Sequence, residues 1–214
     1  MELVWQNLDF LLKGAYYTLL ITVVSMFFGF ILALVLAFAR LKGNIVVKNI
    51  AKFYVSVFRG TPILVQIFII YYGLPDYGIR LGPLTAAFLS LSLNIGAFLS
   101  ETFRGAILSV SKGQTEAAMS LGLTPWQTTY KVVLPQAARV AIPPMGNTFI
   151  GMLKETSLVS IVTVTELLRT AQLLIAQYYI AMPFYIAIAV MYWVMSLLFS
   201  HLLTRIEKNL SKAY

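Results

Sequence analysis

The chain has 214 residues, of which 59% are hydrophobic and only 11% are charged, and its mean hydropathy is +0.82. A soluble domain carries about 25% charged residues, so this composition excludes an ordinary water-soluble domain and predicts an all-α integral membrane protein solvated mainly by membrane lipid. The net charge of +8 is better explained by basic loops that set orientation than by a nucleic-acid partner, and the absence of cysteine excludes a disulfide framework and a thiolate metal site.

Five stretches are apolar enough to be membrane-spanning helices. Each has about the 20 residues that a helix needs to cross the hydrocarbon core, or slightly fewer. In chain order they are Tyr17–Ala39, Phe53–Leu74, Pro83–Phe103, a proline-broken stretch at Ala138–Leu153, and Pro183–Leu203. Residues 1–16 contain two acidic residues and one lysine, and the apolar run that follows is too long for a signal peptide, so we expect a span there.

Lysine and arginine gather on alternate loops. One set of loops holds eleven of them: Arg40, Lys42, Lys48, Lys52, Arg104, Lys112, Lys131, Arg139, Arg205, Lys208 and Lys212. The other set holds four: Lys13, Arg80, Lys154 and Arg169. Because cytoplasmic loops carry the excess of positive charge, we expect the N-terminus outside and the C-terminus in the cytoplasm. This topology requires an odd number of spans, which five satisfies.

Several polar residues fall within the second and third spans. The Arg-Gly-Thr-Pro stretch at 59–62 predicts a kink, since proline removes a backbone donor. Arg59 itself is interpreted as a residue that snorkels to the cytoplasmic headgroups. Asn94 and Glu101 lie at membrane depth, where polar groups usually face a cavity or a partner. The alternatives are a contact between helices for Asn94 and an ion pair with Arg104, three residues on, for Glu101.

The fourth span carries two consecutive prolines, Pro143 and Pro144, which predict a broken helix. Broken helices at membrane depth are tolerated where they line a cavity. The residues that follow are therefore candidates for a polar pathway, with an ordinary outer loop as the alternative: Glu155, Thr156 and Ser157. A short amphipathic helix is expected around 164–177.

The long loop before the fourth span reads as two capped helices. Gly122 is placed to end a short helix that begins near Ser111 or Thr115. Thr124, Pro125 and Gln127 then form an N-terminal signature, with Thr as cap, Pro in the first helical position and Gln three residues after the cap. Two capped helices joined at a glycine make a rigid elbow, and its small apolar surface predicts a cytoplasmic partner that covers it: Ala117, Ala118, Met119 and Leu121.

The sequence lacks the usual catalytic patterns. Its single histidine, His201, has no partner nearby in the chain, no cluster has metal-ligand spacing, and no nucleophile-elbow motif occurs. A phosphate-binding GxxxxGK[ST] motif is also absent. We therefore expect no cofactor in this chain, and any ATP-driven process requires ATP and Mg to be bound by a separate polypeptide.

These motifs together resemble the permease subunits of ABC importers. EAAMSLGLTPWQTTYKVVLPQA looks like the EAA motif of that family, with Glu116, Ala117, Ala118, Gly122, Leu134 and Pro135 in the matching places. RGTPILVQIFIIYYGLP (59–75), ETFRGAILSV with GQTEAA (101–118) and KETSLVS (154–160) are similar to the polar amino-acid permease subfamily. The similarity covers nearly the whole chain.

The resemblance implies one transmembrane permease domain over residues 1–214, with a cytoplasmic coupling loop at about 112–135. That loop would dock on the ATPase through Glu116, Ala117, Ala118, Met119, Leu121 and Gly122. The implied partners are two ATP-binding subunits, a second permease subunit, identical or closely related, and an extracytoplasmic amino-acid-binding protein.

The polar residues on the expected broken spans suggest a substrate. Asn94, Glu101, Glu155, Thr156 and Ser157 would favour a polar and cationic amino acid such as arginine, lysine or histidine. Two other classes of protein are alternatives. An ion-coupled secondary transporter of a small polar solute would explain membrane carboxylates, but not the loop, and it usually carries an internal repeat. A membrane enzyme would need a catalytic cluster.

Overall fold

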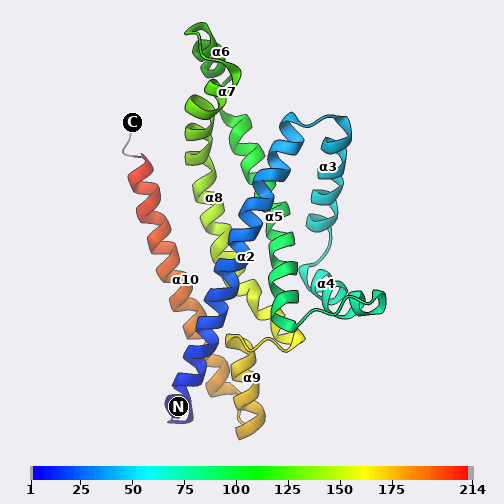
Figure 1. Cartoon of the computed structure of the whole chain (residues 1–214). Coiled ribbons are helices and arrows are strands. Elements are labelled where there is room, and N and C mark those ends of the chain that lie inside the picture. Colours follow the sequence, from blue (N-terminus) through cyan, green and yellow to red (C-terminus); the bar gives the residue numbers. More distant parts are fainter. Residues whose placement is uncertain (1, 212–214) are drawn as a thin grey trace.

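The computed structural model describes residues 2–211, and within that range every element of regular structure is a helix. Lys212, one of the eleven cations counted above, lies outside the described residues. Three helices are long and apolar enough to cross a membrane alone: α2 (Leu8–Lys42), α5 (Pro83–Ser109) and α10 (Met182–Ser211). The bundle is elongated, and α1 (Glu2–Gln6) lies at the opposite end from the last turns of α10 (Figure 1).

Two bent pairs of helices bring the number of candidate spans to five if each pair counts once. The first joins residues 45–60 to 63–77, and the second joins 125–162 to 167–178. Chain ends at opposite ends of a bundle are what an odd number of crossings requires. Five crossings, with the N-terminus outside, stay the prediction.

The second span differs from its predicted shape. Instead of one kinked helix from Phe53 to Leu74, α3 (Ile45–Gly60) and α4 (Ile63–Phe68) meet at a bend of 106°. Helix α4 continues through a π-helical turn, Ile69–Gly73, and a 3-10 turn, Leu74–Tyr77. The break falls at Pro62, as predicted, because the residue before it, Thr61, is extended (φ −117°, ψ 143°), as a residue before proline prefers.

The predicted break at Pro143 and Pro144 is wrong. Both prolines lie inside the continuous helix α8 (Leu134–Glu155), which follows a π-helical turn, Thr129–Val133. Each proline removes one backbone donor but leaves the remaining helical bonds intact, and packing against α5 and α10 supports the helix on both sides. The chain departs from the helix only afterwards, in a 3-10 segment, Thr156–Val162, that ends at Thr163 with φ 65°.

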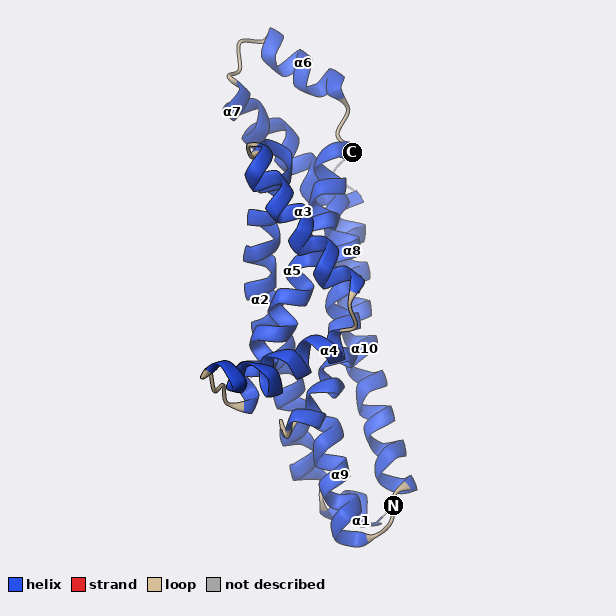
Figure 2. Cartoon of the chain, turned by 90° about the vertical axis from the view of Figure 1, so that its right-hand side faces the viewer, coloured by secondary structure: helices blue, strands red, loops and turns tan. Residues whose placement is uncertain are grey.

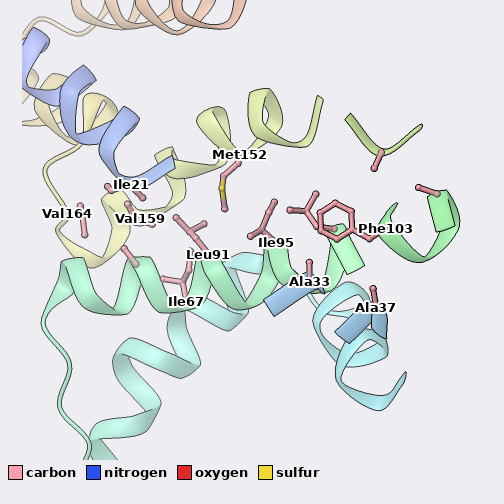
Figure 3. Close-up of a cluster of buried hydrophobic side chains, with 14 of the residues drawn as sticks. Ile21, Ala33, Ala37, Ile67, Leu91, Ile95, Phe103, Met152, Val159 and Val164 are labelled. Carbon is pink, nitrogen blue, oxygen red and sulfur yellow. The ribbon is translucent and has the colours of Figure 1, made fainter. Parts of the chain in front are cut away.

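Helices α2 and α5 form the centre of the bundle. A Cβ added to Gly29 of α2 would collide with the side chain of Ile95, and one added to Gly96 of α5 would collide with Leu32. At each of these glycines, a side chain of one helix therefore packs directly on the backbone of the other, which small residues allow in membrane proteins. Figure 3 shows the surrounding apolar cluster, in which Leu91 and Met152 join these helices to α8.

Helix α9 (Leu167–Tyr178) confirms the short helix expected around 164–177. Its buried residues Leu167 and Ala171 belong to a second apolar cluster with Leu11 of α2 and Phe184 of α10. The cluster lies at the end of the bundle that carries α1 (Figure 1). It fixes α9 between the first and last long helices.

Candidate functional site

The loop that the sequence singled out projects beyond the end of the bundle (Figure 2). Helix α6 (Lys112–Ser120) begins after Ser111 and ends two residues before Gly122, whose φ is +84°. The Gly122 amide donates to Met119 O at 2.9 Å, and the Leu123 amide donates to Ala118 O at 3.2 Å. The left-handed glycine thus satisfies the free carbonyls of the last turn, and the predicted helix end is confirmed.

The second half of the loop is capped as predicted. Helix α7 (Pro125–Thr128) has Thr124 as its N-cap, and Thr124 Oγ1 accepts from the Gln127 amide at 3.3 Å. In return, the Thr124 amide donates to Gln127 Oε1 at 2.9 Å. These reciprocal bonds satisfy two otherwise free donors and hold α6 and α7 in a fixed elbow.

Large apolar side chains lie exposed on this elbow. Leu121 is 84% exposed, Trp126 is 72% exposed and Met119 is 43% exposed. Glu116 and Ala117 are also exposed, whereas Ala118 is only 5% exposed and packs within the loop. The expectation that both alanines lie at the surface is therefore wrong for Ala118. Trp126 was missed as a contact, although an exposed tryptophan is a common anchor in protein interfaces.

Glu101 is held by two arginines. Its pair with Arg104, three residues on, is confirmed: Arg104 Nη2 donates to Glu101 Oε2 at 2.8 Å. Arg40, from the last turns of α2, pairs with the other carboxylate oxygen. Sequence spacing gave no signal for Arg40, because the two residues are 61 positions apart. Both oxygens of Glu101 are thus engaged within the chain.

Asn94 is buried and joins α5 to the break between α3 and α4. Its Nδ2 donates to Gln66 Oε1 at 3.0 Å and to Phe58 O at 3.3 Å. Gln66 Nε2 in turn donates to Phe58 O at 2.9 Å and to Thr61 O at 3.1 Å. These two side chains therefore bond carbonyls released by the break at Pro62. Gln66 was missed, although a glutamine within an apolar run was a visible signal.

The candidates Glu155, Thr156 and Ser157 lie at the end of α8 that is farther from the elbow, whereas Glu101 lies in the half of α5 that leads into the elbow. Glu155 is exposed. Thr156 is fully buried, and its hydroxyl donates to Leu153 O at 2.8 Å. The Ser157 hydroxyl donates to Lys154 O at 2.8 Å. The structure brings these residues together with one another, but not with Glu101.

Helix α8 also has an exposed face that was not predicted, and we call it the polar face because Asn147, Lys154 and Glu155 lie on it. Pro144, Asn147, Lys154 and Glu155 are exposed, and Gly151 between them is partly exposed. Steps of three or four residues place them on one side of the helix. A Cβ added to Gly151 would meet nothing within 4 Å. A polar face on a membrane helix requires water or a partner.

One carboxylate is completely buried at the start of α9. Glu166 accepts from the Leu168 amide at 2.9 Å and from the Arg169 amide at 2.8 Å, so it caps the helix. The hydroxyl of Tyr192, on α10, donates to it at 2.7 Å. Beside it, the Leu167 amide donates to Thr18 Oγ1 of α2 at 3.2 Å. This cluster joins α9 to α2 and α10, and its members are far apart in the sequence.

Replacing this carboxylate is expected to destabilise the protein. Glu166→Ala leaves two amides and the Tyr192 hydroxyl without their acceptor, and each unsatisfied buried group costs about 1–3 kcal/mol. We expect a clear fall in the Tm of the purified protein, measured by fluorescence-detected unfolding. Glu166→Gln keeps one acceptor oxygen and should lose less. Equal Tm values for both variants and the intact chain would contradict the role assigned to Glu166.

The fold and these surfaces define a class: a multi-pass helical membrane protein with a rigid loop at one end and a polar face along one helix. The chain belongs to the family of binding-protein-dependent transport system inner membrane components, whose family model matches residues 12–212. This membership confirms the resemblance to importer permeases, and it places the chain among subunits that work beside a substrate-binding protein.

Relatives and a solved structure extend the comparison. The chain is 44% identical over 200 residues to the L-cystine transport system permease protein TcyB of Bacillus subtilis, covering 93% of this chain and 86% of TcyB. It is 39% identical over 209 residues to the glutamine transport system permease protein GlnP of Escherichia coli, covering 97% and 95%. A crystal structure of an amino acid ABC transporter with histidines has the same fold, with a TM-score of 0.92, 35% identity and 96% of each chain covered.

Proposed function

We propose that the chain is the membrane-spanning subunit of an ATP-driven importer of a polar amino acid, and that α6 and α7 couple it to a separate ATPase. The observation that carries the coupling is the elbow itself. Its backbone is held at the junction of the two helices, by the Gly122 and Leu123 amides at the end of α6 and by the Thr124 cap of α7, yet Leu121, Trp126 and Met119 are exposed on it. A loop that only connected two helices would have no physical reason to expose these side chains.

The coupling mechanism follows from the rigidity of the elbow. A flexible loop would absorb a movement of the ATPase, whereas a capped one transmits it to α5 and α8, which the loop joins directly. Closure of the ATPase around ATP and Mg would then rotate the helix bundle as a body. The exposed apolar side chains supply the docking contact, and Gly122 sets the angle between the two short helices.

The pathway is proposed to lie along the polar face of α8, between two permease subunits. In one protomer this face is exposed, although it runs along a membrane helix. A second copy, or a close relative, would enclose it in a water-filled space, which is where polar membrane residues are usually found. Glu155 lies at the far end of this face from the elbow and makes no ion pair among residues 2–211.

The proposed substrate is a cationic amino acid, because Glu155 can meet an ammonium or guanidinium group. The relatives' names point to other polar amino acids, since TcyB is a permease for L-cystine and GlnP for glutamine. Cationic amino acids, glutamine and cystine all carry an α-amino group and an α-carboxylate. The experiment must therefore compare substrates directly.

Uptake into proteoliposomes tests the function. The chain is co-purified with its ATPase and binding protein, and labelled arginine, histidine, glutamine and cystine are offered with and without ATP inside. We expect ATP-dependent uptake, and Glu155→Gln should lower uptake of the cationic amino acids by about tenfold, the cost of losing one charged hydrogen bond. Glu207→Gln, near the end of α10, is the matched control and should retain uptake.

Each alternative gives a distinct result. Uptake driven by an ion gradient without ATP would mean that the protein is a secondary transporter and not an ATP-driven importer. Uptake of glutamine or cystine alone would support the importer and contradict a cationic substrate. Unchanged uptake of every probe by Glu155→Gln would show that this carboxylate is not in the pathway.

A further inference from the structure

Arg59 lies within the second candidate span of the chain. It is in the last turn of α3, fourteen residues beyond Ile45, which is about 20 Å along the helix axis at 1.5 Å per residue. Helix α3 starts at the end of the bundle where α2 finishes and runs beside α5 to the point where α4 turns aside (Figure 1). Lys52, which the charge count places on the cytoplasmic side, is seven residues earlier on α3, so Arg59 lies about 10 Å further along the helix, inside the second candidate span.

The Arg59 side chain rests on an aromatic ring. Its guanidinium carbon is 5.4 Å from the centroid of Phe98, which is near the middle of α5 and 42% exposed. Such a cation–π contact holds the planar group over one face of the ring. Arg59 makes no side-chain hydrogen bond or ion pair among residues 2–211 and is exposed in the protomer, so its N–H donors stay available.

No carboxylate among residues 2–211 forms an ion pair with Arg59. Glu101, the acidic residue of α5, lies three positions beyond Phe98, and both of its carboxylate oxygens already pair with Arg40 and Arg104. A positive charge at membrane depth is costly unless it meets an anion or water. Arg59 can therefore pair with an anion from outside the described protomer.

The surface around Arg59 is open. The next residue is Gly60, and Gly105 lies two turns beyond Phe98 on α5; a Cβ added to either glycine would meet nothing within 4 Å. The polar side chains at the α3–α4 break, Gln66 and Asn94, bond each other and the carbonyls of the break. A small ligand can thus approach Arg59 without displacing an existing hydrogen bond.

We propose that Arg59, held against Phe98, binds the α-carboxylate of the transported amino acid on the exposed surface of α3 and α5. The inference rests on the proposed function. The guanidinium fork matches a carboxylate through two parallel hydrogen bonds, and Phe98 fixes the plane of that fork. Because every amino acid carries an α-carboxylate, this site would act on the feature common to all substrates, while other residues distinguish their side chains.

Equilibrium binding to the purified permease–ATPase complex, without the external binding protein, tests this assignment. The probes are labelled L-arginine, L-glutamine and L-cystine, with the α-carboxamides of arginine and glutamine as competitors. We expect the intact complex to prefer the free acid, and Arg59→Gln to weaken binding of the free acid by at least about tenfold. The preference of the Arg59→Gln complex for acid over amide should fall to about one, whereas Arg59→Lys should keep part of it.

Arg80→Gln is the matched control, because it removes the same charge from an exposed loop residue and should leave both affinities unchanged. Equal weakening of acid and amide by Arg59→Gln, or loss of the ATPase from the variant complex, would assign Arg59 a structural role and overturn the inference. ATP-driven uptake by an intact complex that binds none of the probes would also overturn it, but would leave the proposed function standing. Absence of ATP-driven uptake would instead remove the proposed function.

Discussion

Gly122→Val is expected to reduce ATP hydrolysis stimulated by binding protein and amino acid to the basal level in proteoliposomes. Gly122 has a φ of +84°, a conformation that costs a residue with a Cβ roughly 1–2 kcal/mol and disfavours a β-branched residue most. Relief of this strain rotates the end of α6 and breaks the bonds of the Gly122 and Leu123 amides. Met119 and Leu121 then leave the positions in which they would contact the ATPase.

Gly113→Val provides the matched control for this variant. Gly113 lies in the first turn of α6, is exposed, has no positive φ, and a Cβ there would meet nothing within 4 Å. The same chemical change should therefore leave stimulation close to that of the intact chain. Full stimulation of the Gly122→Val complex would mean that the elbow is a well-capped connection without a coupling role.

Gly29→Val is expected to destabilise the helix bundle. An added Cβ would collide with the side chain of Ile95 and lie 3.2 Å from the carbonyl oxygen of Ser92, and valine adds two methyl groups beyond it. A backbone atom of a packed helix cannot move aside, so α2 and α5 must separate. Overpacking of this kind costs about 1–3 kcal/mol or more. We expect lower yield and a Tm several degrees below that of the intact protein.

Phe28→Val separates this packing effect from a general effect of valine in α2. Phe28 is the neighbouring residue and is exposed on the outside of the bundle, where the smaller side chain should change the Tm little. A Gly29→Val protein with the Tm of the intact chain would show that α2 and α5 do not meet at this position.

The sequence determined the features that depend on nearby residues. The capping box at Thr124 and the glycine stop at Gly122 were predicted and confirmed, because their hydrogen bonds join residues within five positions. The long apolar helices α2 and α10 were predicted for a similar reason, since mean hydropathy is a local property. The pair between Glu101 and Arg104 follows from helical spacing alone.

The tertiary structure decided every feature that depends on distant residues. Arg40 meets Glu101 only because α2 and α5 pack side by side. Gln66 and Asn94 meet only because the chain turns by 106° after α3. Pro143 and Pro144 stay helical, against their local preference, within a helix that neighbouring helices support. Local hydrogen bonding can be read along the chain, whereas a side chain's distant partner is set by how the helices pack.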